Sequence, residues 1–212
     1  MSHIYPDAHL SKNTVSALLD ALGSNLHNQR NFFEYLSKSS SYMAVDLTHI
    51  FSESNKMGIN ELGYNPDHIW NPQINLLLIW AIDNRHPAFF KVLPGSINSV
   101  SSLIDGIKGR KDIENAFYAL KHGIECDKTW MQDGIKLRGF FFIAFISLYL
   151  YTRILDHLSR KGLLSEYSVP DVLSYLSSVH VVDAGGTLFW SEIPKSCKEL
   201  IERLEISITQ KL

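Results

Sequence analysis

The spacing of apolar residues divides the first half of the chain into helical and strand-like segments. In residues 9–40, apolar positions at helical spacing predict two helices, separated by a break at residues 23–25. Three later runs are apolar and rich in β-favouring residues, which is typical of strands. A polar turn at residues 83–86 joins the second and third runs and predicts an antiparallel hairpin. The three predicted strands are Tyr42–Phe51, Gln73–Ile82 and Ala88–Leu93.

Helical spacing dominates the second half of the chain. Pro170 is compatible with the first turn of one predicted helix. Ser196 and Glu199 have the spacing of a capping box at the start of the last helix. Two short apolar runs around Ala184-Gly185-Gly186 predict a small hairpin. The predicted helices are Ser99–Ile107, 110–124, Ile135–Leu158, Val169–Leu176 and Ser196–Ile206, and the hairpin strands are Val179–Asp183 and Thr187–Trp190.

Together these elements predict an α+β protein. We expect a small mixed sheet with an antiparallel hairpin, packed by helices and followed by a mainly helical C-terminal part. The predicted organisation is an N-terminal helical segment at 1–40, a sheet-containing region at 41–126, and a helical C-terminal region with a small hairpin at 127–212.

Composition narrows the class of protein. The 212 residues can bury a substantial core, and a net charge of −2 means that DNA binding would depend on local patches. Two cysteines without C-x-x-C spacing indicate neither a disulfide framework nor a zinc ribbon. The N-terminus lacks a signal-peptide pattern, and the longest apolar run, Phe140–Tyr151, is shorter than the ~20 residues of a membrane span. We therefore expect a cytoplasmic protein with no membrane partner.

Charged residues gather along one edge of the helix predicted at 110–124. At 100° per residue, Arg110, Glu114 and Lys121 lie within about 40° of one another. An apolar stripe, formed by Ile113, Phe117, Leu120 and Ile124, lies beside this edge. The pattern holds a carboxylate next to a buried face, which suits either an active site or an ordinary ion pair.

Asp46 stands out because strands tend to exclude aspartate. A turn, a sheet edge or a hydrogen-bonded buried carboxylate would explain it. The alternative is a metal ligand on a central strand, since a buried carboxylate needs a cationic or hydrogen-bonding partner.

Several segments, taken in order, resemble the DDE transposases of bacterial and archaeal insertion sequences, whose catalytic domain has a ribonuclease H-like fold. The R-x3-E-x6-K spacing of Arg110, Glu114 and Lys121 is similar to the signature around the catalytic glutamate of that family. The signature usually has a tyrosine where this chain has Ile107. The other similar segments are V-D-L-T at 45–48, F-S-E-S at 51–54, G-Y-N-P-D at 63–67, P-Q-I-N-L at 72–76, P-A-F-F-K-V-L-P-G at 87–95, S-V-S-S-L at 99–103 and G-F-F-F-I-A-F-I-S-L-Y-L at 139–150.

The resemblance implies that residues 41–126 form a partial ribonuclease H-like catalytic region. It makes Asp46 and Glu114 catalytic ligands of Mg²⁺ or Mn²⁺, while Arg110 and Lys121 hold DNA phosphates. In such enzymes two metals about 3.5–4 Å apart assist strand cleavage and transfer. The implied partners are the terminal inverted repeats of a transposon, and a second copy of the chain or a full-length transposase.

One part of the family pattern is missing. The family has a second aspartate at the end of a further strand, between the positions of Asp46 and Glu114, and this chain has only residues 96–113 there. We hypothesise an internal deletion joined near Ile107–Gly109, which would leave an edge of the Asp46 strand exposed. Asp105 and Asp112 are the available substitutes for the second aspartate. We predict that metal-dependent DNA cleavage is lost.

Two alternatives remain open from the sequence. The chain could be an active enzyme that uses a replacement carboxylate or an assembled oligomer. It could also be a non-catalytic DNA-binding or protein-interaction module, in which Arg110 and Glu114 form an i,i+4 ion pair worth about 0.3 kcal/mol.

Overall fold

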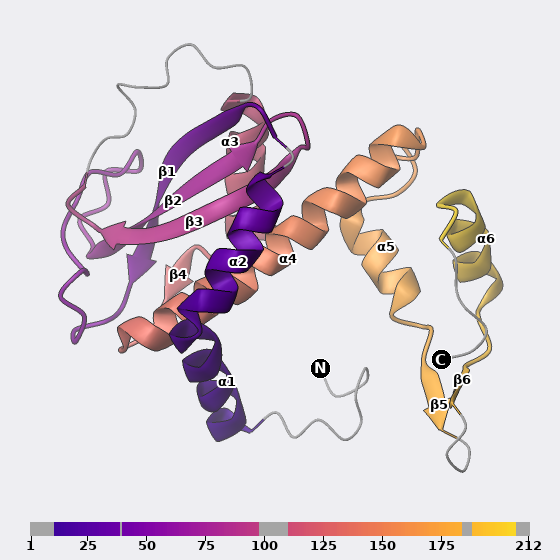
Figure 1. Cartoon of the computed structure of the whole chain (residues 1–212), viewed down its shortest axis with the longest axis horizontal. Coiled ribbons are helices and arrows are strands. Elements are labelled where there is room, and N and C mark those ends of the chain that lie inside the picture. The colour runs from indigo at the N-terminus through magenta and orange to yellow at the C-terminus, as the bar shows by residue number, and fades with distance from the viewer. Residues whose placement is uncertain (1–10, 39, 98–109, 184–187, 207–212) are drawn as a thin grey trace. The chain divides into compact units, whose positions relative to one another are not determined.

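The structure is a computed structural model that describes residues 11–38, 40–97, 110–183 and 188–206 (Figure 1). The chain forms two compact units, Ser11–Thr152 and Arg153 onward. The first contains a mixed four-stranded sheet with helices, and the second contains helices and a two-stranded sheet. The prediction of an α+β protein with a small mixed sheet is therefore confirmed. The helix expected at Ser99–Ile107 and the turn at Ala184-Gly185-Gly186 lie outside the described residues.

The four-stranded sheet has the order β3-β2-β1-β4. β1, β2 and β3 pair antiparallel, so the predicted hairpin is confirmed. In this register Asp46 of β1 lies opposite Leu78 of β2. The strands are β1 (Met43–Ser52), β2 (Gln73–Ala81), β3 (His86–Pro94) and β4 (Lys128–Thr129).

β4 was not predicted, because two residues carry no alternating pattern. It pairs parallel with the last two residues of β1, Phe51 and Ser52. The Phe51 N–H donates to the carbonyl of Asp127, and the Glu53 N–H donates to the carbonyl of Thr129. Within the described residues, β4 therefore covers only the end of the β1 edge that the sequence predicted to be exposed.

Hydrogen-bonding side chains fix where the helices of this unit begin. The hydroxyl of Ser11 accepts from the Thr14 N–H at the start of α1, and the amide oxygen of Asn25 does the same for α2. Asp133 accepts from the N–H groups of Ile135 and Lys136 at the start of α4. The helices are α1 (Lys12–Ser24), α2 (Leu26–Ser37), α3 (Arg110–Tyr118), the π-helix η2 (Ala119–Gly123) and α4 (Gly134–Arg160).

Aromatic rings join α2 and α4 to the sheet, which both helices pack against (Figure 1). The ring of Phe33 on α2 lies 5.6 Å from Phe90 on β3 and 5.3 Å from Phe145 on α4. Phe90 and Phe145 also contact each other, with centroids 5.5 Å apart. These contacts, together with burial of Phe141 and Leu148, place the core between the sheet and the two helices.

α1 crosses α4 at two glycines. A Cβ atom on Gly139 would lie closer than 3.0 Å to the backbone oxygen of Leu19, and one on Gly23 would lie closer than 3.0 Å to that of Ile135. The Nε of Arg138 donates to the Gly23 carbonyl at the same crossing. The two helix backbones therefore touch where only glycine fits.

α4 is the one helix among the described residues that is long and apolar enough to cross a membrane. That is weak evidence, since the core helix of a soluble protein has the same composition. Phe141, Phe145 and Leu148 of this helix are buried within the first unit.

The second unit contains α5 (Val169–Leu176), β5 (Val181–Asp183), β6 (Leu188–Trp190) and α6 (Lys195–Arg203). Ser168 and Asp171 form a capping box at the start of α5, with Pro170 in the first turn as expected. The predicted cap at Ser196 is wrong. α6 begins one residue earlier, after Pro194, which adopts an extended backbone before the helix and leaves Ser196 inside the first turn.

Candidate functional site

Asp46 lies near the middle of β1 and is half-buried. Its Oδ1 accepts a hydrogen bond from the N–H of the next residue, Leu47, at 2.8 Å. This bond helps to satisfy a carboxylate within an apolar strand, where desolvation would otherwise be costly. Asp46 thus lies on a strand that pairs along its length with β2.

Glu114 lies on α3, the helix that packs against β1. The predicted apolar stripe is confirmed, since Ile113, Phe117 and Leu120 are buried in the core. Glu114 itself is exposed beside this stripe. Arg110 is the first residue of α3, and its side chain lies outside what the structure describes.

Lys121 lies in a different helical geometry from Glu114. The α-helix becomes the π-helix η2 at Ala119, and the Ile124 N–H donates to the Ala119 carbonyl five residues earlier. Single π-helical turns inside α-helices are frequent at functional sites. The sequence argument assumed one regular α-helix, so the edge shared by Glu114 and Lys121 is less regular than predicted. Lys121 is half-buried, whereas Glu114 is exposed.

A charged cluster that the sequence did not predict lies around Lys121. The Nε2 of His49, on β1, is 3.4 Å from the Oδ2 of Asp67, in the loop before β2. The side chain of His49 is 10% exposed and that of Asp67 is 60% exposed. Burial lowers the pKa of Lys121, while the nearby Asp67 and Asp127 carboxylates act in the opposite direction. Lys121 of η2, His49 of β1 and Asp67 of the loop before β2 therefore interact electrostatically.

Buried amides hold the loop that carries Asp67. Gln73, the first residue of β2, is fully buried, and its Nε2 donates to the carbonyls of Tyr64 and Gly95. Its Oε1 accepts from the Nδ2 of Asn65 at 3.2 Å. Because these amides are hydrogen-bonded, the loop has a defined position beside His49. Asn65 and Gln73 belong to the segments that suggested the family resemblance.

His49 should make the stability of the protein depend on pH. Burial, and then the positive charge of Lys121, lower its pKa below the ordinary value of 6.5, while Asp67 opposes this shift. As the pH falls through 6.5 towards the lowered pKa, the unfolded chain takes up a proton that the folded protein excludes. We therefore expect the free energy of unfolding to fall over this range, and to be unaffected by His49 above it. Urea unfolding at several pH values should show a steeper acid-side loss for the native protein than for His49→Gln. Equal slopes would contradict this assignment.

The carboxylates do not form the donor set that the resemblance implies for two divalent metals. Among the described residues, no three His, Cys, Asp or Glu side chains gather into a group that could hold a metal ion. Asp112 is half-buried on α3 and belongs to no such group, and Asp105 lies outside the described residues. The described side chains therefore do not fit the implied Mg²⁺ or Mn²⁺ site.

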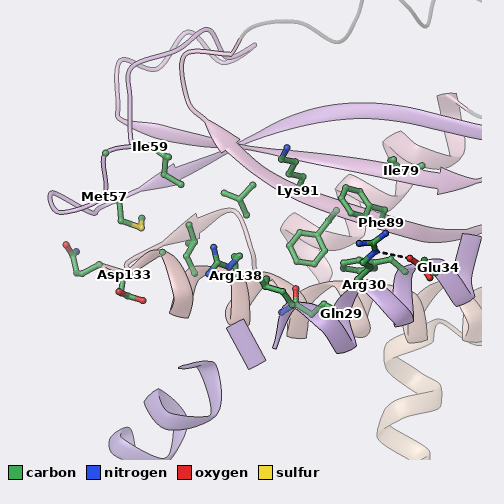
Figure 2. A pocket seen from close by; sticks show the side chains of 18 of the residues that line it. Gln29, Arg30, Glu34, Met57, Ile59, Ile79, Phe89, Lys91, Asp133 and Arg138 are labelled. Atoms are coloured by element: carbon green, nitrogen blue, oxygen red, sulfur yellow. Dashed lines mark hydrogen bonds and ion pairs between the residues drawn. The ribbon is translucent and has the colours of Figure 1, made fainter. Parts of the chain in front are cut away.

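The first unit also contains a cavity of about 1150 Å³. Residues of α2, β3, the 56–59 loop and the start of α4 line it, as Figure 2 shows. Of the residues predicted for catalysis or phosphate binding, the three with described side chains, Asp46, Glu114 and Lys121, do not line this cavity.

Comparison of the chain with protein-family models, curated proteins and solved structures finds no match. The residues and their geometry carry the functional argument.

Proposed function

We propose that this chain derives from an insertion-sequence DDE transposase and retains part of a ribonuclease H-like catalytic domain. The observation that carries the proposal is the packing of α3 against β1. Asp46 lies within the first strand of the mixed sheet, and the helix that bears Glu114 packs against that strand. This is the arrangement expected if the two carboxylates descend from two of the acidic metal ligands in one catalytic site.

The arrangement of β4 supports the proposed internal deletion. In the family, the second aspartate ends a strand that comes before the glutamate helix, beside the strand of the first aspartate. Among the described residues, the strand on the side of β1 away from β2 comes after α3 and consists of Lys128 and Thr129. It ends in threonine, so it supplies no carboxylate at the family position. The proposed junction at Ile107–Gly109 lies outside the described residues.

The same proposal makes the protein defective in DNA cleavage. A two-metal mechanism needs ligands that clamp both metals. Among the described residues, no third carboxylate joins Asp46 and Glu114 in a group that could hold a metal ion. The proposed molecular function is therefore DNA contact without cleavage, at transposon ends or together with a full-length transposase.

Phosphate contact is assigned to the edge formed by α3 and η2. Arg110 opens α3, Lys121 lies in η2, and Lys128 is exposed in the nearby β4. Lysine and arginine neutralise phosphates and release condensed counterions, which makes DNA binding sensitive to salt. With a net charge of −2, the chain depends on such a local patch for any DNA affinity.

Replacing Lys121 with glutamine should weaken DNA binding about threefold to tenfold and reduce the slope of log affinity against log salt by about 1. The measurement is a salt titration by fluorescence anisotropy, with a labelled duplex of the DNA that flanks the gene. Lys198→Gln, which removes an exposed charge from α6, is the matched control and should bind like the native protein. Equal losses in the two variants would show that only net charge matters and would refute the assigned edge.

A further inference from the structure

The cavity of about 1150 Å³ is slightly larger than most small-molecule sites and has a similar lining. Pockets for small molecules usually enclose about 300–1,000 Å³ and combine an apolar lining with a few polar groups. This cavity lies wholly within the Ser11–Thr152 unit. Strand residues and helix residues face each other across it (Figure 2).

Much of the lining is apolar and held in place by packing. Phe33 and Phe89 form an aromatic pair with ring centroids 5.1 Å apart and rings at 72°. Leu137, in the first turn of α4, is 1% exposed. Met57 and Ile59 complete the apolar surface from the 56–59 loop and pack against the core. An apolar body would therefore meet a preformed surface.

The charges of the lining are unequal, with four cations and two carboxylates. Both carboxylates already have partners. Glu34 pairs with Arg30 at 2.9 Å, and Asp133 accepts from the N–H groups that start α4, where hydrogen bonding to the Lys136 N–H lowers its pKa.

Two of the cations, Lys56 and Lys91, contact no carboxylate within 4.0 Å among the described residues, and both are exposed at the rim. Arg138 donates its Nε to the Gly23 carbonyl, which leaves its other guanidinium N–H groups as donors near the cavity. Lys91 comes from the strand side and Arg138 from the helix side of the space (Figure 2). The uncompensated charge of the lining is therefore positive.

We infer that this cavity binds a small amphipathic anion, with an elongated apolar body on the Phe33, Phe89 and Leu137 surface and an anionic head group at the lysine-bearing rim. A carboxylate or a phosphate monoester supplies the same head-group chemistry, since both accept charge-assisted hydrogen bonds from lysine and arginine. This inference does not depend on the proposed transposase origin, because Lys121 and Lys128, the residues with described side chains that are assigned to DNA contact, do not line the cavity.

Calorimetric titration of the full chain with dodecanoate and with dodecyl phosphate, below their micelle concentrations, tests the inference. We expect saturable binding of one molecule by at least one of the two, and which of them binds defines the head group. Dodecanol should bind at least tenfold more weakly, and acetate and inorganic phosphate should give no measurable binding. Within a series of shorter chains, each methylene removed should weaken binding about threefold to fourfold.

Charge variants locate the site. Lys56→Met and Lys91→Met keep the apolar stem and should each weaken binding of the anionic probe about fivefold. Lys111→Met, on the exposed surface of α3 and away from the cavity, should leave binding unchanged. Unchanged thermal unfolding midpoints would establish that all three variants fold.

Equal affinity for dodecanol would overturn the inference, because the charge of the rim would then play no part. It would also fail if neither anionic probe bound, or if Lys111→Met weakened binding as much as the two rim variants. DNA binding by the same samples provides a separate readout, so the outcome for the proposed transposase origin remains distinguishable.

Discussion

Replacing Gly139 with alanine is expected to destabilise the Ser11–Thr152 unit by about 3 kcal/mol or more. The added methyl group would lie closer than 3.0 Å to the backbone oxygen of Leu19, and a helix backbone cannot rotate away as a side chain can. The α1–α4 crossing must therefore open, and Arg138 loses its bond to the Gly23 carbonyl as the helices separate. Urea unfolding followed by tryptophan fluorescence measures the effect, because Trp70, Trp80 and Trp130 lie in this unit.

Gly134→Ala is the matched control in the same helix. A Cβ atom there meets nothing within 4 Å, so the same chemical change occurs without a clash. We expect its unfolding midpoint to stay equal or to rise slightly, since alanine favours helix over glycine by up to about 1 kcal/mol. If Gly139→Ala proved as stable as Gly134→Ala, the close helix crossing would be wrong.

Much of the fold follows from local patterns. The hairpin was predictable because two apolar, β-rich runs flank a polar turn. The observed strands differ from the predicted bounds by at most two residues at each end. The burial of Ile113, Phe117 and Leu120 followed from helical spacing alone. These features need no information from distant parts of the chain.

Other features depend on contacts between distant segments. His49 reaches Asp67 and Lys121 only when β1, the following loop and η2 are packed together. The π-helical turn at Ala119–Gly123 has no simple composition signal, and β4 exists only because residues 128–129 meet the end of β1. The cavity likewise arises where α2, β3 and α4 leave space between them. Sequence spacing could not have located any of these.

The candidate site shows the same division. The sequence singled out Asp46 and Glu114 by their residue types, and the packing of α3 against β1 is the tertiary relation that any shared role of the two would require. Catalysis would also require a third metal ligand close to these two carboxylates, and its position depends on the tertiary structure. Among the described residues, neither Asp112 nor another acid joins such a group.

We propose that the protein retains a transposase-derived scaffold and does not cut DNA. We therefore expect the protein to produce no nicked DNA. A supercoiled plasmid that carries the DNA flanking the gene should show no nicks above background with purified protein in Mg²⁺ or Mn²⁺. Asp46→Ala and Glu114→Ala should give the same result as the native chain, with unchanged thermal unfolding midpoints as evidence that both variants fold.

The most direct measurement is this nicking assay, run with the native chain and Asp46→Ala side by side. We expect both proteins to show the same background level of plasmid nicking in either metal. Metal-dependent nicking by the native chain that disappears in folded Asp46→Ala would contradict it.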